Sequence, residues 1–284
     1  MINQHQTTKE PMKIALVFFS PTGSTALVAE HIRDYLLDCR AVPTLIDITP
    51  MAYRGESLDM APYDALILGV PVHSWRAPRV VRNWISGLCG DGKPCSTFFT
   101  YGGFQIHPAH HSTRTLLENA GFRLVSSAEF PASHTFNLGG WKAMENRPDE
   151  SDFAVAKEYA EKTSCRFSGE DRNLPGPFEP TTHTEAFLDE IEMFRFRILS
   201  SLPARKAKSC SLCGICQEIC PTGAFDAQRG AASADMCIAC LGCLLRCPEQ
   251  AITIPDLSES FAFKLKAEGM TIDQMQTKES RIYF

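Results

Sequence analysis

Apolar and polar positions along the first half of the chain predict strands and helices in alternation. Residues 13–19 (KIALVFF) form a continuous apolar run, typical of a strand buried on both faces, and a turn rich in Ser, Thr and Gly follows it. Residues 24–38 then place apolar side chains at helical spacing. The same order recurs, with predicted strands at 44–48, 65–70, 96–101 and 123–130 and predicted helices at 78–88 and 112–119.

Five alternating strand and helix units predict an α/β fold with a doubly wound parallel sheet. Such sheets bind ligands at the carboxyl ends of their strands, near the point where the strand order reverses. We therefore expect functional residues in the loops that follow the predicted strands.

The pattern changes in the second half of the chain. Residues 150–166 and 184–201 predict helices, and the Pro-rich segment 173–183 between them predicts a linker or surface loop. Beyond Pro203 the composition shifts to Cys, Gly and Ala in two similar stretches, an internal repeat of about 27 residues. The predicted parts are a disordered tail (1–11), an α/β domain (12–172), a linker with a connecting helix (173–205), a small α+β domain (206–255) and a C-terminal extension (256–284).

Composition narrows the class of protein. With 284 residues, 44% hydrophobic and 21% charged, the chain can bury a core and form one large domain and one small one. It has no apolar run of membrane-spanning length, and its first residues lack the features of a signal peptide, so we expect a cytoplasmic protein without a membrane partner. The formal charge of −5 argues against nucleic acid and favours a partner protein with a basic docking face.

The twelve cysteines are unevenly placed, with eight between Cys210 and Cys247. Thiols of a cytosolic chain stay reduced, so this dense and regular cluster indicates metal ligation and not cross-linking. We expect the scattered cysteines to be small buried apolar residues. They are Cys39, Cys89, Cys95 and Cys165.

The cysteine cluster contains the pattern C-x2-C-x2-C-x3-C-P twice, starting at Cys210 and at Cys237. It resembles bacterial two-cluster ferredoxins, in which three neighbouring thiolates hold one 4Fe-4S cube and the fourth reaches the other cube. The resemblance implies Cys210, Cys213, Cys216 and Cys247 as ligands of one cluster, and Cys237, Cys240, Cys243 and Cys220 as ligands of the second. The alternative is a pair of structural zinc sites, but zinc ligands usually form separated C-x2-C pairs.

The loop after the first predicted strand carries Ser20, Thr22, Gly23, Ser24 and Thr25, and a helix follows. Backbone N–H groups at a helix N-terminus bind phosphate, and Ser and Thr hydroxyls can join them. The loop resembles the T/S-x-T-G-x-T pattern with which flavodoxins hold the phosphate of FMN. Neither the G-x-x-x-x-G-K-[ST] loop of nucleotide triphosphatases nor the G-x-G-x-x-G loop of dinucleotide-binding proteins occurs after a strand.

Two further loops, at 69–78 and 100–104, look like the ring-binding loops of flavodoxin-ferredoxin fusion proteins of anaerobic bacteria. The resemblance spans nearly the whole chain and implies FMN, two 4Fe-4S clusters and a flavodoxin-like sheet with strand order 2-1-3-4-5. Either His73 or Trp75 could contact the flavin. The alternative, that these side chains only pack the loop, stays open. The implied positions are Pro71, Val72, His73, Ser74, Trp75, Thr100, Tyr101, Gly102 and Gly103.

Three histidines, His107, His110 and His111, follow the second of these loops. No carboxylate or cysteine with ligand spacing accompanies them, so we expect a solvated loop or a helix start and not a metal site.

Two functions fit these features. The first is an electron-transfer protein in which FMN and the clusters exchange electrons with redox partner proteins, such as a reductase, a ferredoxin or a terminal enzyme. The alternative is an FMN-dependent reductase in which a small substrate stacks on the flavin near His73, Trp75 and Tyr101. A redox or iron sensor is a third hypothesis, weakened by the lack of a recognisable output module.

Overall fold

The computed structural model describes residues 10–198, 201–206 and 209–284, and the side chains of residues 107 and 196–198 are outside this description. Residues 1–9 of the predicted disordered tail (1–11) lie outside the described residues. Residues 199–200, near the end of the predicted helix 184–201, lie outside them as well.

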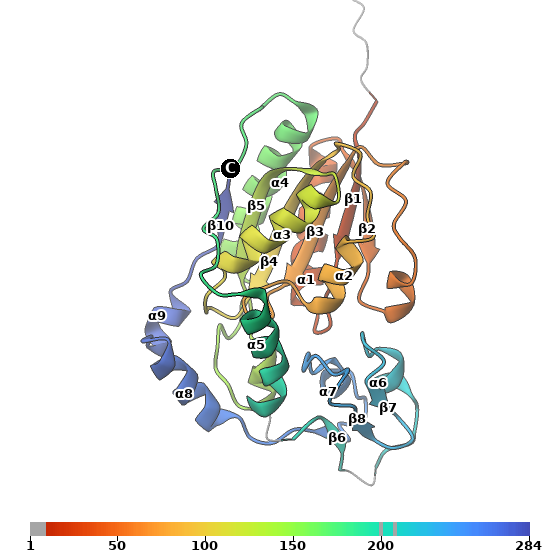
Figure 1. Ribbon diagram of the computed structural model, residues 1–284, viewed down its shortest axis with the longest axis vertical. Helices are drawn as coiled ribbons and strands as arrows, with labels where there is room; N and C mark the ends of the chain where they lie inside the picture. Colours follow the sequence, from red (N-terminus) through yellow and green to blue (C-terminus); the bar gives the residue numbers. More distant parts are fainter. Residues whose placement is uncertain (1–9, 199–200, 207–208) are drawn as a thin grey trace, which may run out of the picture.

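A six-stranded sheet forms the centre of the larger part of the protein (Figure 1). The strand order is β10-β5-β4-β3-β1-β2, and β1 to β5 are parallel. This confirms the expected α/β fold with order 2-1-3-4-5, which is the flavodoxin-like order. The strands are β1 (Lys13–Phe18), β2 (Val42–Asp47), β3 (Ala65–Pro71), β4 (Pro94–Tyr101), β5 (Arg123–Pro131) and β10 (Arg281–Tyr283).

Helices cover both faces of this sheet, which explains why its central strands β1 and β3 are almost entirely apolar. Ile14 and Leu16 of β1 pack on the face that α1 and α4 cover, whereas Ala15 and Val17 pack on the face of α2 and α3. Successive side chains of a strand point to opposite faces, so these central strands present apolar residues to both helical layers. The helices are α1 (Ser24–Asp38), α2 (Arg79–Ile85), α3 (His107–Asn119) and α4 (Glu150–Ser168).

The scattered cysteines differ in exposure. Cys95 is buried as expected, but Cys89 and Cys165 are exposed and Cys39 is partly exposed, so the expectation of four buried cysteines was wrong. Cys165 lies near the end of α4, outside the helix face that packs on the sheet, and Cys89 lies in the loop before β4.

The cysteine-rich part is small and repeats itself. It contains a four-stranded sheet of two-residue strands in the order β7-β8-β6-β9, with two short helices, α6 (Ile215–Glu218) and α7 (Gly242–Leu245). Equivalent positions of the two cysteine stretches share a left-handed backbone conformation, so the sequence repeat is also a structural repeat. These pairs are Leu212 and Ala239, Gly214 and Leu241, and Gly223 and Gln250. The strands are β6 (Ala204–Arg205), β7 (Phe225–Asp226), β8 (Ala231–Ala232) and β9 (Ile252–Thr253).

Three further helices and two short 3-10 turns complete the described structure. The helices are α5 (Glu185–Ile198), α8 (Ser258–Ala267) and α9 (Ile272–Gln276), and the turns are η1 (Met51–Arg54) and η2 (Thr135–Gly139). Phe261 and Leu265 of α8 pack with Phe136 and Trp141 in an apolar cluster separate from the two sheet faces. Among the described helices, none combines the length and apolarity that crossing a membrane requires.

The chain returns to the large sheet at its end, which the sequence patterns did not predict. After the cysteine-rich part, α8 and α9 lead back to β10, which pairs antiparallel with β5 (Figure 1). The hydroxyl of Tyr283 donates to Oε2 of Glu129 at 2.9 Å, and the Nε2 atom of His110 lies 3.2 Å from the same oxygen. The cysteine-rich part is therefore bracketed in sequence by segments of the α/β part.

We predict that Tyr283→Phe lowers the free energy of unfolding by about 1.5 kcal/mol, because it removes a hydrogen bond to a buried carboxylate. Urea unfolding measures this, with Tyr53→Phe, a tyrosine that is 67% exposed, as the control. Equal losses in the two variants would contradict the role given to the Tyr283 hydroxyl.

Candidate functional site

The eight clustered cysteines gather into two pockets. One pocket, with about 360 Å³ of empty space, is lined by Cys210, Cys213, Cys216 and Cys247. A second, with about 320 Å³, is lined by Cys220, Cys237, Cys240 and Cys243. Each set joins three cysteines of one stretch with the last cysteine of the other, which is the crossed grouping that the ferredoxin resemblance implies. No group of three or more His, Cys, Asp or Glu side chains in the described part of the chain is arranged around a single metal ion.

Backbone N–H groups point at several of these sulfurs. The N–H of Ala224 donates to Sγ of Cys220 at 3.2 Å, and the equivalent N–H of Ala251 donates to Sγ of Cys247 at 3.3 Å. Hydrogen bonds to cluster thiolates are one of the means by which proteins set cluster potentials.

Burial differs between the two quartets. Cys237 and Cys240 are buried, and burial raises the pKa of both thiols, to about 12 for Cys240. Such thiols ionise only when a metal or cluster takes the negative charge. In the other quartet Cys213 is exposed, and its neighbour Leu212 is 46% exposed. One quartet therefore faces the interior of the protein and the other lies near the surface.

The loop between β1 and α1 leaves its backbone donors open. Gly23 has a left-handed conformation (φ 102°) at the N-cap of α1, and no side chain caps the helix. No described residue accepts a hydrogen bond from the backbone N–H groups of residues 22–25. Free N–H groups at the start of a 15-residue helix form an anion site.

Hydrogen bonds hold the two ends of this loop in place. Thr49 accepts from the N–H of Ser20 at 2.7 Å, and Oγ of Ser20 accepts from the N–H of Ala26 at 3.0 Å. The hydroxyls of Thr25 and Thr100 are 2.7 Å apart and join the loop to the end of β4. The loop thus lies at the carboxyl edge of the sheet, where doubly wound folds bind ligands.

Two adjoining pockets extend from this loop. The first holds about 420 Å³ of empty space, and the second holds about 950 Å³. Val72, Tyr101 and Gly102 line both. Of the fourteen predicted flavin-site residues the structure brings twelve to these pockets, namely Ser20, Thr22, Ser24, Thr25, Pro71, Val72, His73, Ser74, Trp75, Thr100, Tyr101 and Gly102.

The two predicted residues that do not line a pocket are glycines with structural roles. Gly23 provides the turn into α1, as described above. Gly103 has φ 82°, and a Cβ there would lie 2.7 Å from the side chain of Met275. Gly102 is restricted as well, because its Cβ would lie 2.4 Å from the ring of His134.

The larger pocket has a wall that the sequence analysis missed. Opposite the two predicted loops, it is formed by the region around η2 and by α5 and α8. Lys264 lies over the rings of Trp75 and Phe104, with its Nζ atom 5.7 and 5.3 Å from the ring centroids. No sequence motif marks this wall. Its members are His134, Phe136, Trp141, Ile191, Phe194, Arg195 and Lys264, while Phe104 and Gln105 line the pocket from the predicted loop 100–104 and the residue after it.

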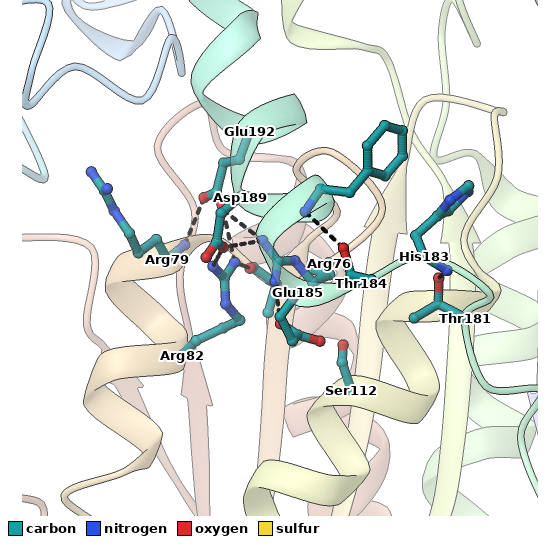
Figure 2. A network of polar contacts seen from close by, with 12 residues as sticks. Arg76, Arg79, Arg82, Ser112, Thr181, His183, Thr184, Glu185, Asp189 and Glu192 are labelled. Carbon is teal, nitrogen blue, oxygen red and sulfur yellow. Dashed lines mark hydrogen bonds and ion pairs between the residues drawn. The ribbon is translucent and has the colours of Figure 1, made fainter.

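An ion-pair network holds α5 against the loop after β3 (Figure 2). Arg76 follows Trp75 in that loop and is 1% exposed. Its Nη1 atom donates to Glu185 at 2.5 Å and its Nη2 atom donates to Asp189 at 2.6 Å. Arg82 of α2 donates to Glu192 at 2.9 Å. Two arginines and three carboxylates thus join the loop after β3, here called the ring loop, and α2 to the first turns of α5.

Two histidines at the pockets are held neutral. Burial lowers the pKa of His73 well below its usual value, and the positive charge of Arg195 lowers it further. Burial and the charges of Arg195 and Lys264 lower the pKa of His134 to about 3. Neither ring is therefore a cation at neutral pH.

The three histidines lie at the start of a helix, which is one of the two structures that the sequence analysis expected for them. α3 begins at His107, and Pro108 lies in its first turn. His110 is buried, and its Nδ1 atom is 2.8 Å from the hydroxyl of Ser127. Because His110 is buried against β5 and Tyr283, it does not lie in a solvated loop.

The cysteine loop 237–243 contacts the predicted flavin site directly. A Cβ on Gly242 would lie 3.0 Å from the carbonyl oxygen of Pro21, so the two loops are in van der Waals contact. Ile238 and Cys240 belong to an apolar cluster that contains Phe19 and Tyr101. Arg54 of η1 also donates to the carbonyl oxygen of Pro221.

Comparisons with known proteins give one family match and several similar solved structures. Residues 206–226 match the family described as 4Fe-4S binding domain. A search of curated proteins gives no match. Solved structures similar to this chain include a flavodoxin from the domain Archaea (14% identity, 55% of this chain and 99% of that chain, TM-score 0.43) and Flavodoxin 1 from Bacillus cereus (16% identity, 56% and 99%, TM-score 0.41). Another is the Streptococcus pneumonia TIGR4 flavodoxin (15% identity, 56% and 99%, TM-score 0.40).

The strand order of the large sheet is flavodoxin-like, and residues 206–226 are similar to a 4Fe-4S binding domain. The chain therefore combines a flavodoxin-like sheet with a ferredoxin-like segment. Clusters of the 4Fe-4S type conduct electrons, so this combination supports electron transfer as the class of function.

We predict that Arg76→Met increases amide hydrogen exchange in residues 185–195 at least tenfold. The substitution removes the buried cation that binds Glu185 and Asp189, and the first turns of α5 then open more easily. Arg33→Met, which removes an exposed pair with Asp34, is the control and should leave α5 unchanged. Unchanged exchange in Arg76→Met would show that the network does not hold α5.

Proposed function

We propose that this protein is an iron–sulfur flavoprotein that passes electrons between FMN, two 4Fe-4S clusters and external redox partner proteins. The observation that carries the proposal is the contact between the loop of Cys240 and Cys243 and the loop of residues 20–25, at Gly242 and Pro21. This contact puts a candidate cluster site and a candidate flavin site side by side in one chain.

The residues at the carboxyl edge of the sheet fit FMN. The unpaired N–H groups of residues 22–25 suit a phosphate dianion, and the hydroxyls of Thr22 and Ser24 line the same pocket. Val72, Tyr101 and Gly102 connect this pocket to the larger one, where Trp75 and Tyr101 offer aromatic surfaces to a planar ring. When bound, FMN exchanges electrons singly or in pairs, whereas each cluster exchanges one.

The two cysteine pockets fit two clusters. Each is lined by four cysteines in the crossed grouping, and left-handed residues at equivalent positions shape both loops in the same way. We assign Cys210, Cys213, Cys216 and Cys247 to an outer cluster, and Cys237, Cys240, Cys243 and Cys220 to an inner cluster. The exposure of Cys213 and the burial of Cys240 support an electron path from a partner through the outer and inner clusters to the flavin, open in both directions.

A second candidate function is the reduction of a small molecule at the flavin. The observation that favours it is that three aromatic side chains, Phe104, Phe136 and Trp141, line the larger pocket together with Trp75 and Tyr101. A pure carrier needs no such aromatic lining. Electron-acceptor screening of the reduced protein separates the two functions, because only the reductase shows saturable turnover with a small acceptor.

The direct test is anaerobic reconstitution of the full chain, followed by quantification of flavin, iron and sulfide. The proposal expects about one FMN, eight iron and eight sulfide per chain. Iron without flavin would overturn the assignment of residues 20–25. Four iron per chain would overturn the assignment of the second cluster.

We predict that Thr22→Asp weakens FMN binding about 100-fold or more but changes riboflavin binding less than threefold. A carboxylate beside the phosphate site repels the phosphate, at roughly 4 kcal/mol for unit charges about 4 Å apart at an effective dielectric constant of 20. Riboflavin has the same ring without the phosphate. Quenching of flavin fluorescence measures both affinities, and Thr22→Asn is the matched neutral control. Equal losses for the two flavins would contradict a phosphate site in this loop.

A further inference from the structure

Arg195 of α5 is a buried cation without an anionic partner. It is 8% exposed, its Nε atom is buried without a hydrogen-bond acceptor, and no described residue forms an ion pair or hydrogen bond with its guanidinium. Its described contact is with the ring of Phe136, whose centroid lies 5.2 Å from Cζ. The residues whose side chains are not described, at 1–9, 107, 196–200 and 207–208, include no Asp or Glu.

A buried arginine in this condition is unusual. Placing a charge in a protein interior costs several kcal/mol unless an opposite charge or hydrogen bonds compensate for it. Burial lowers the pKa of Arg195 to about 10, so the side chain still carries its charge at neutral pH. Arg76 shows the contrast, because it is also buried but binds carboxylates of three residues. No carboxylate among the described residues forms an ion pair with Arg195, so a bound anion could take that place.

The position of Arg195 narrows the identity of that anion. Its side chain lines both the pocket that starts at the loop of residues 20–25 and the larger pocket beside Trp75 and Tyr101. Burial lowers the pKa of Arg195, whereas the charge of Glu192 and, to a smaller extent, thiolate charge at Cys240 and Cys237 raise it, although none of these groups forms an ion pair with the guanidinium. The ion pairs of Glu185, Asp189 and Glu192 fix the helix one to three turns before it.

We propose that Arg195 binds the negative charge that the flavin ring gains on reduction and thereby raises the reduction potential of the bound flavin. Uptake of two electrons and one proton leaves the ring with one negative charge, and cationic groups near it stabilise that form selectively. By linkage, a cation that binds the reduced flavin more tightly than the oxidised flavin raises the potential by the same free energy. This inference rests on the proposed flavin site.

The experiment compares Arg195→Met, Arg195→Lys and wild-type full-length protein, each reconstituted with clusters. FMN affinity is measured for the oxidised flavin and, anaerobically with dithionite as reductant, for the reduced flavin. We expect Arg195→Met to weaken reduced FMN at least tenfold more than oxidised FMN, which corresponds to a fall in potential of about 30 mV for a two-electron couple. Arg195→Lys should retain most of the wild-type preference, because it keeps a charge on a long side chain.

Arg79→Met is the matched control, since it removes one positive charge from an exposed side chain on α2 and leaves the backbone N–H bond to Glu192 in place. It should leave the ratio of the two affinities unchanged. Equal weakening of both flavin forms by Arg195→Met, with normal iron content, would overturn the inference and leave the flavin site intact. Absence of flavin binding in the wild type would instead overturn the proposed function.

A third result would assign Arg195 to another anion. Benzoate is the probe for an external carboxylate, because it combines a planar ring with the charge that the pocket lacks. If benzoate perturbs the flavin spectrum of the wild type but not of Arg195→Met, while the affinity ratio is unchanged, the arginine serves a substrate carboxylate and the inference is wrong. No spectral effect of benzoate together with a changed ratio supports it.

Discussion

Apolar packing between the loop 237–243 and the α/β part is the interaction on which the arrangement of the whole protein depends. Side chains of this loop alternate between two apolar clusters: Ile238 and Cys240 join the cluster on one sheet face, and Ala239 and Leu241 join the cluster around Phe136. Successive residues thus enter different cores, so the loop cannot shift without exposing apolar surface on both sides. This packing gives one cysteine quartet a fixed position beside the loop of residues 20–25.

Charge is distributed unequally around the same region. Three carboxylates on α5 meet Arg76 and Arg82, and these pairs join the helix to the ring loop. One to three turns later along the same helix, Arg195 has no such partner. The network therefore both anchors α5 and holds Arg195, which has no ion-pair partner among the described residues, against the pockets.

The sequence was sufficient for features that depend on local patterns. Continuous apolar runs such as residues 13–19 predicted the five parallel strands, since both faces of the sheet are covered. The resemblance of the cysteine pattern to two-cluster ferredoxins implied the grouping that the two pockets show. Features made by distant segments left no such pattern. β10 has only three residues, and its place is set by its pairing with β5 and by the hydrogen bond of Tyr283 to Glu129. The wall of the larger pocket comes from three segments that are far apart in the sequence.

The central claim is that the candidate cluster and flavin sites of one chain form a continuous electron path. The most direct test is the rate at which electrons, injected photochemically into the clusters of the reconstituted protein, reach the flavin at several protein concentrations. The account predicts a rate that is independent of protein concentration, because the contact between Gly242 and Pro21 lies within the chain. A rate that rises in proportion to protein concentration would mean that electrons pass between molecules, which would contradict the account.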